Sequence, residues 1–151
     1  MRTVSSTYTP AREAEETASR AALGVASVAL AGMAYCHIRD VGMKFDEHVY
    51  YMAGLFCGNI ALSLALIPAL ILAELRGSAR SRQIVWAATA GLAAATIVGF
   101  VWSRTIGFPQ MADHVGEWDA LGVTSLVFEG ILLALSLAML THVARTKMHR
   151  P

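Results

Sequence analysis

The stretch DALGVTSLVFEGILLALSLAMLTH, from Asp119 to His142, decides the fold class of this chain. It is an almost wholly apolar run of about twenty residues, the length that an α-helix needs to cross a bilayer. Its interior holds one carboxylate, Glu129. Burying a charged side chain at the centre of a membrane helix costs about 2.5–3.5 kcal/mol, so such a residue usually has a function.

One face of this predicted helix collects its small and polar residues: Gly122, Ser125, Glu129 and Ser136. Their spacing of three, four and seven residues places them on the same side of an α-helix. The opposite side is Leu, Val, Ile, Ala and Met. We therefore expect the polar face to point at other helices and the apolar face to contact lipid.

The composition of the whole chain agrees with this interpretation. Of the 151 residues, 56% are hydrophobic and 15% are charged, whereas a soluble domain usually has about 25% charged residues. The net charge of +1 and the lack of a basic patch interleaved with aromatic residues argue against nucleic acid as a partner. We expect the lipid bilayer to be the surroundings of most of the chain.

Four apolar runs predict an all-α integral membrane protein, a bundle of four transmembrane helices over about residues 20–38, 49–75, 83–103 and 120–143. Together they make a transmembrane domain over residues 18–143. A polar, disordered tail over residues 1–17 is expected before it and a basic tail over residues 144–151 after it. Several residues have the chemistry to end or cap these helices: Gly42, Asp46, Gly77, Ser81 and Asp119.

The distribution of Lys and Arg predicts the orientation of the bundle, because cytoplasmic segments carry more of them. Nine lie in the two tails and the second loop: Arg2, Arg12, Arg20, Arg76, Arg80, Arg82, Arg145, Lys147 and Arg150. The first and third loops hold three: Arg39, Lys44 and Arg104. Both termini are therefore expected in the cytoplasm. The excess of Arg over Lys and the abundance of Ala are typical of GC-rich bacterial genomes, so we expect a bacterial cytoplasmic (inner) membrane.

Two stripes of small residues are candidates for close helix packing. Ala87, Gly91, Ala95 and Gly99 repeat every fourth residue, and Gly54 and Gly58 form a GxxxG motif. Small residues allow helix backbones to approach closely in a membrane. We interpret both stripes as packing surfaces within the four-helix bundle. The alternative is that they serve a homodimer or a larger membrane complex.

Polar residues of three predicted helices fall at a similar depth. Asn59 and Glu129 each lie nine or ten residues from the outer end of their helix, and Thr96 reaches a similar level. We predict a polar pocket that opens outward, with Asn59, Thr96 and Ser125 around Glu129 as a proton or cation site. Arg104 can reach toward Glu129 as a counter-charge. The simpler alternative is that Glu129 is a hydrogen-bonded tie between helices.

A metal site at the outer face is a second hypothesis. Its candidate ligands are His37, His48, His114, Asp40 and Glu47. His with carboxylates would suit Zn²⁺, and His with the nearby Met and Cys residues would suit Cu(I). However, neither HExxH nor CxxC occurs, and no two His residues have a ligand spacing on one predicted helix. The sequence therefore leaves the cofactor open.

No motif for covalent catalysis occurs, since GxSxG, the P-loop and GxGxxG are all missing, so the sequence gives no reason to expect an enzyme.

The segment SRTIGFPQMADHVGEWDALGVTSLVFEG, residues 103–130, resembles small four-span membrane proteins of actinobacteria and related bacteria, which carry an S-R-T-x-G-x-P turn and an E-G pair. This resemblance implies the four-span architecture and leaves the activity open. We expect a protein that handles an ion or small molecule, or a membrane-complex subunit. The alternative is a metal-binding or redox-cofactor membrane protein, which could include an enzyme.

Overall fold

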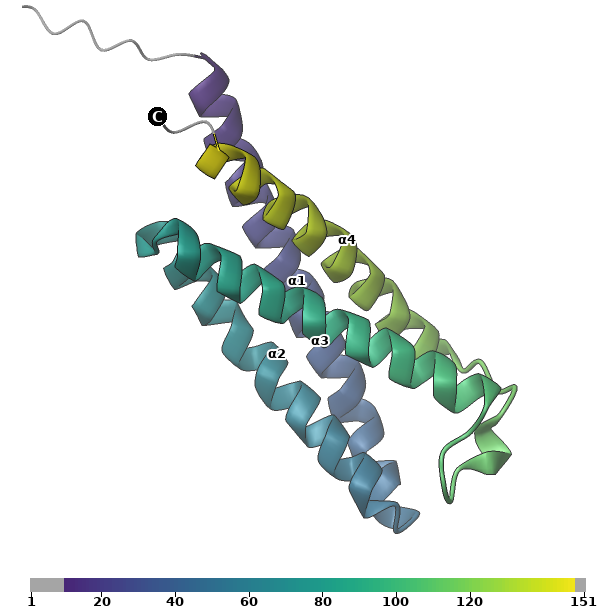
Figure 1. Ribbon diagram of the computed structural model, residues 1–151. Coiled ribbons are helices and arrows are strands. Elements are labelled where there is room, and N and C mark those ends of the chain that lie inside the picture. Colours follow the sequence, from purple (N-terminus) through teal and green to yellow (C-terminus); the bar gives the residue numbers. More distant parts are fainter. Residues whose placement is uncertain (1–9, 149–151) are drawn as a thin grey trace, which may run out of the picture.

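The computed structural model describes residues 10–148, which form four long α-helices and one short 3-10 helix (Figure 1). The elements are α1 (Pro10–Asp46), α2 (Tyr50–Arg76), α3 (Ala79–Thr105), η1 (Ala112–His114) and α4 (Ala120–Met148). Helix α1 packs on α2 and α4, and α3 packs on α4 and, less extensively, on α2. The helices thus form a ring in the order α2, α1, α4, α3.

All four long helices are long and apolar enough to cross a membrane. Many of their large apolar side chains are exposed, among them Leu55, Leu62, Val98, Val127 and Leu137. Such a surface suits lipid and not water, because contiguous apolar patches of this extent are rare on soluble monomers. The predicted all-α fold with four helices of membrane-span type is confirmed, and it indicates a multi-pass membrane protein. The direction of the termini stays a prediction.

The helices are longer than the apolar runs alone indicated. Helix α1 begins at Pro10 and continues through Gly42 to Asp46, so residues 10–17 of the predicted tail are helical and Gly42 ends nothing. Helix α4 continues to Met148, into the predicted basic tail. Polar helix ends extend beyond an apolar span because backbone hydrogen bonds do not require apolar side chains. Residues 1–9 and 149–151 of the two predicted tails lie outside the described residues.

Of the five predicted helix ends and caps, Gly77 and Asp119 are correct, and Gly42, Asp46 and Ser81 are wrong. Gly77 follows the last residue of α2, and Asp119 Oδ1 accepts a hydrogen bond of 2.7 Å from the Gly122 amide at the start of α4. Asp46 belongs to α1, and α2 starts after Val49 without a side-chain cap. Helix α3 is capped by Ser78, which accepts from the Ser81 amide. A polar residue can cap wherever the chain turns, so a cap is easily misplaced by a few residues.

Helix α1 provides much of the hydrophobic core. The largest cluster of buried residues consists of Ala26, Ala29, Leu30, Met33, Leu70, Trp86, Ala93 and Leu132. Four of these eight side chains come from α1. Gly32 lets α1 approach α4 closely, because a Cβ atom at this position would lie 2.6 Å from the ring of Phe128.

The small-residue stripes do not pack within the bundle as predicted. Gly91 of α3 and the Gly54–Gly58 pair of α2 are exposed, and a Cβ atom added to any of these glycines would meet nothing within 4 Å. Leu92, one residue further along α3, instead packs against the core. Helices α2 and α3 run together at the turn of residues 77–78 and separate toward their other ends (Figure 1). The stripes face this separation or the outside of the bundle.

Candidate functional site

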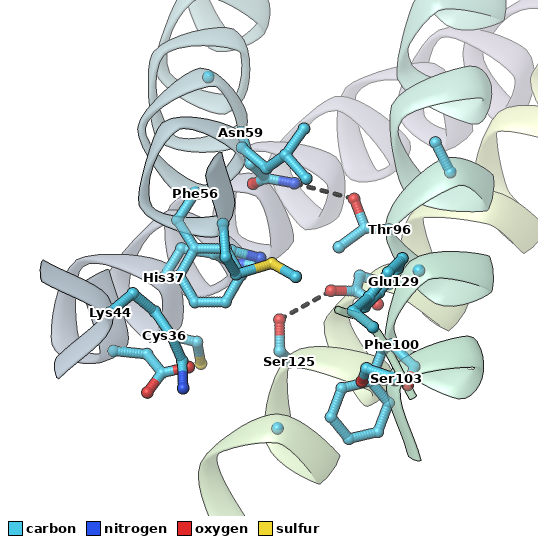
Figure 2. Close-up of a pocket in the computed structure, with 18 of the residues that line it drawn as sticks. Cys36, His37, Lys44, Phe56, Asn59, Thr96, Phe100, Ser103, Ser125 and Glu129 are labelled. Carbon is cyan, nitrogen blue, oxygen red and sulfur yellow. Dashed lines mark hydrogen bonds between the residues drawn. The ribbon is translucent and has the colours of Figure 1, made fainter. Parts of the chain in front are cut away.

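A cavity of about 390 Å³ lies where α2 and α3 separate, and we call it the central cavity (Figure 2). All four helices and the connection between α3 and α4 contribute to its lining. Helices α1 and α4 form the wall opposite the gap between α2 and α3. Five residues predicted for the pocket line it: Asn59, Thr96, Arg104, Ser125 and Glu129. The structure therefore gathers residues from α2, α3 and α4 that are up to 70 positions apart in the chain.

Glu129 of α4 is the most deeply placed ionisable group of the central cavity, with 1% of the residue exposed. Ser125, one turn earlier on α4, donates a hydrogen bond of 2.8 Å to Oε1 of Glu129 (Figure 2). The second oxygen, Oε2, is buried and has no hydrogen-bond partner among the described residues. Buried polar atoms are normally paired, so this unpaired oxygen, on a residue that lines the cavity, requires an explanation.

The predicted polar face of α4 points inward. Ser125, Glu129 and Ser136 are 6%, 1% and 0% exposed. Gly122 lies against Phe100 of α3, because a Cβ atom there would be 2.4 Å from the Phe100 ring. The spacing along α4 thus predicted the buried face correctly.

Asn59 and Thr96 join α2 to α3 across the central cavity. Nδ2 of Asn59 donates a hydrogen bond of 2.8 Å to Oγ1 of Thr96, which itself donates to the carbonyl oxygen of Leu92 (Figure 2). Ser63 donates to the side-chain oxygen of Asn59 at 3.2 Å. Asn59 therefore forms hydrogen bonds with Thr96 and Ser63, whereas Glu129 accepts its hydrogen bond from Ser125.

Arg104 lies on the cavity lining but does not pair with Glu129. Its guanidinium donates to Oδ2 of Asp119 at 2.6 Å, and it stacks over the Phe100 ring at 5.1 Å from the ring centre. Asp119 is the last of the 14 residues that connect α3 to α4, so its distance from Arg104 depends on the path of that connection. Arg104, which was suggested as the counter-charge of Glu129, thus pairs with Asp119 just before α4 begins.

Helix α1 contributes a group of side chains that the sequence did not assign to the pocket. Cys36, His37, Asp40 and Lys44 all line the central cavity. Nδ1 of His37 donates to the Met33 carbonyl oxygen at 2.9 Å, and Nζ of Lys44 donates to Glu47 at 2.7 Å. Their spacing of three or four residues marks one helix face, which could have been noticed in the sequence.

The five candidate metal ligands do not come together. His37 faces the central cavity, His48 bonds to the Asp46 carbonyl oxygen at 2.9 Å, and His114 contacts Glu117 at 3.1 Å. Glu47 pairs with Lys44, and Asp40 lines the central cavity. Within residues 10–148, no group of three or more His, Cys, Asp and Glu side chains is placed to hold a metal ion.

A second carboxylate, Glu74, whose side chain is 6% exposed, lies near the opposite end of α2. Its Oε1 accepts a hydrogen bond of 2.7 Å from Nε1 of Trp86, and its Oε2 accepts one of 3.1 Å from Ser19. Arg82 is 3.9 Å from Oε2. This cluster ties α1, α2 and α3 together and does not line the central cavity. Both oxygens of Glu74 are paired, which distinguishes it from Glu129.

Comparison with protein-family models, with curated proteins and with solved structures finds no match to this chain.

Proposed function

We propose that this chain is a small multi-pass membrane protein that binds an ion or small molecule in the central cavity, with Glu129 as the anchoring group. The observation that carries the proposal is that Glu129 lines the cavity and that one of its carboxyl oxygens, Oε2, is buried without a hydrogen-bond partner in residues 10–148. A ligand that brings a cation or a hydrogen-bond donor to this oxygen would complete its bonding.

The electrostatics of the cavity favour a cationic ligand. Burying an ionised carboxylate without a positive charge beside it is strongly unfavourable, and a cation at that place offsets part of the cost. The two basic side chains of the lining, Lys44 and Arg104, are bonded to Glu47 and Asp119. A bound cation would therefore supply what the protein itself does not place beside Glu129.

The proposed location is the cytoplasmic membrane of a bacterium, with the central cavity toward the outer face. The Lys and Arg distribution supports this orientation, since the cavity lies at the end of the bundle with the less basic connections, residues 47–49 and 106–119. The excess of Arg over Lys and the abundance of Ala support a bacterial membrane. The exposed small residues of α2 and α3 support a second role, as a surface for another chain.

The test uses purified full-length protein and measures its melting temperature with Na⁺, K⁺ or methylammonium added. A ligand that binds only the folded state raises the melting temperature with concentration. We expect at least one of these cations to do so, and Glu129→Gln to remove the effect while the protein still folds. Glu117→Gln, at an exposed position outside the cavity, is the matched control and should respond like the unmodified chain. An identical response of Glu129→Gln, or no response to any cation, would contradict the proposal.

A further inference from the structure

The gap between α2 and α3 is lined by small residues. Gly54 and Gly58 of α2 and Ala95 and Gly99 of α3 all belong to the lining of the central cavity. A Cβ atom added to any of the three glycines would meet no atom within 4 Å. No side chain of the described residues fills the space beside these glycines, so the gap is open on the side where the bundle faces lipid.

The edges of this gap are apolar. Leu55 and Leu62 of α2 line the cavity, and they are also 60% and 55% exposed on the outside of the bundle. Leu92 of α3 lines it from the other side. An alkyl chain beside these leucines would stay in contact with apolar side chains, and the polar contact that it meets between α2 and α3 is the hydrogen bond from Asn59 to Thr96.

The connection between α3 and α4 covers the end of the cavity that lies next to it. Phe108 and Met111, from the connection between α3 and α4, line the cavity there, and Met111 packs with Val49 and Met52 in a small buried cluster. The hydroxyl of Tyr51 donates to the carbonyl oxygen of Pro109, which fastens this connection to α2. Between α2 and α3 the hydrogen bond from Asn59 to Thr96 crosses the gap, and the small residues Gly54, Gly58, Ala95 and Gly99 line it.

We propose that the gap between α2 and α3 admits a single-chain amphiphile with an ammonium head group from the bilayer. The head group reaches the carboxyl group of Glu129 on the opposite wall, and the alkyl chain lies between α2 and α3 beside Leu55, Leu62 and Leu92. The proposal rests on the binding role of Glu129 and adds the class of ligand and its route. Glu129 lines the cavity without an ion pair in residues 10–148 and supplies the charge complementarity, and the small residues supply the opening.

The experiment uses the full chain in phosphatidylcholine nanodiscs with dodecylammonium that carries a photoreactive diazirine on its chain. After illumination, mass spectrometry locates the labelled residues. We expect labelling on the cavity side of α2 and α3, and competition by unlabelled dodecylammonium but not by dodecanol, which lacks the charge. Glu129→Gln should reduce the labelling about tenfold.

Blocking the gap tests the route. Ala95→Leu places a large side chain in the gap, and Ala87→Leu makes the same change two turns earlier on α3, at an exposed position outside the cavity. We expect at least a fivefold loss of labelling in Ala95→Leu and no change in Ala87→Leu. Gly58→Leu blocks the gap from α2 and replaces Ala95→Leu if that variant does not fold.

The remaining outcomes overturn the proposal in distinguishable ways. Equal labelling in Ala95→Leu, Gly58→Leu and the unmodified chain would exclude the route between α2 and α3. Equal competition by dodecanol would exclude recognition of the ammonium group. A melting-temperature rise with methylammonium but no specific labelling would contradict the amphiphile and leave the proposed function standing, whereas failure of both ligands would contradict both. A dimer in native mass spectra that is lost in Ala95→Leu, with labelling unchanged, would assign the gap to a second copy of the chain.

Discussion

Ser125 donates a hydrogen bond of 2.8 Å to Oε1 of Glu129, and this leaves Oε2 of the same carboxyl group buried without a partner in residues 10–148. The two residues are one helical turn apart on α4, so the bond adds nothing to the contact between helices. Asn59, which could have tied Glu129 to α2, bonds to Thr96 instead. An arrangement that served only to hold the bundle together would use both carboxyl oxygens, as Glu74 does.

Close packing of α1 on α4 predicts a strong difference between two glycines. Gly32→Leu forces a side chain into the ring of Phe128, which lies 2.6 Å from an added Cβ atom. The free energy of unfolding in mixed micelles should therefore fall by about 1–3 kcal/mol. Gly91→Leu makes the same change at an exposed position with nothing within 4 Å and should leave stability within about 0.5 kcal/mol. Equal losses would mean that α3 packs against the bundle through its small-residue stripe.

The hydrogen bond between Trp86 and Glu74 should be important for stability. Trp86→Phe removes the donor and leaves Oε1 of Glu74 buried and unpaired, which costs about 1–3 kcal/mol before any loss of packing. Trp102→Phe, at a residue that is 47% exposed, is the control and should change stability by less than about 0.5 kcal/mol. The measurement compares the free energies of unfolding of Trp86→Phe and Trp102→Phe in the same micelles. A smaller effect at Trp86 than at Trp102 would disprove the buried tie.

Asp119 has two roles that two substitutions separate. Asp119→Asn keeps an oxygen that can accept from the Gly122 amide but loses the ion pair with Arg104, and because Asp119 is half-exposed this should cost less than about 1 kcal/mol. Asp119→Ala also removes the helix cap and should cost about 1 kcal/mol more. Only the ion-pair part should shrink when the ionic strength is raised. Identical losses in both variants would show that the cap contributes nothing.

The predicted orientation can be tested with single cysteines. After replacement of Cys36 and Cys57, Asp113→Cys lies in the connection before α4 and Ser78→Cys in the turn between α2 and α3. A membrane-impermeant thiol reagent applied to intact cells should label residue 113 and not residue 78. The reverse pattern would place the central cavity on the cytoplasmic side.

The sequence by itself determined the four helices, since about twenty consecutive apolar residues can satisfy their backbone in a bilayer only as a helix or a closed barrel, and helical spacing on the last span favoured the helix. It also predicted the buried face of α4, because helical spacing fixes which residues share a side. Gly77 and Asp119 were found as helix ends because their chemistry acts on the adjacent turn. All of these features depend on residues within a few turns of one another.

Only the tertiary structure decided which surfaces meet. Small residues are equally suited to a helix contact and to an open gap, so the sequence could not show that Gly54, Gly58 and Gly91 lack intrachain neighbours. The partner of Arg104 depends on the path of the connection that precedes Asp119, and the position of the central cavity depends on how far α2 and α3 separate. Both features depend on distances between parts of the chain that are far apart in sequence. Helical spacing fixes the direction in which a side chain leaves its own helix, but it does not fix which residue of another helix lies in that direction.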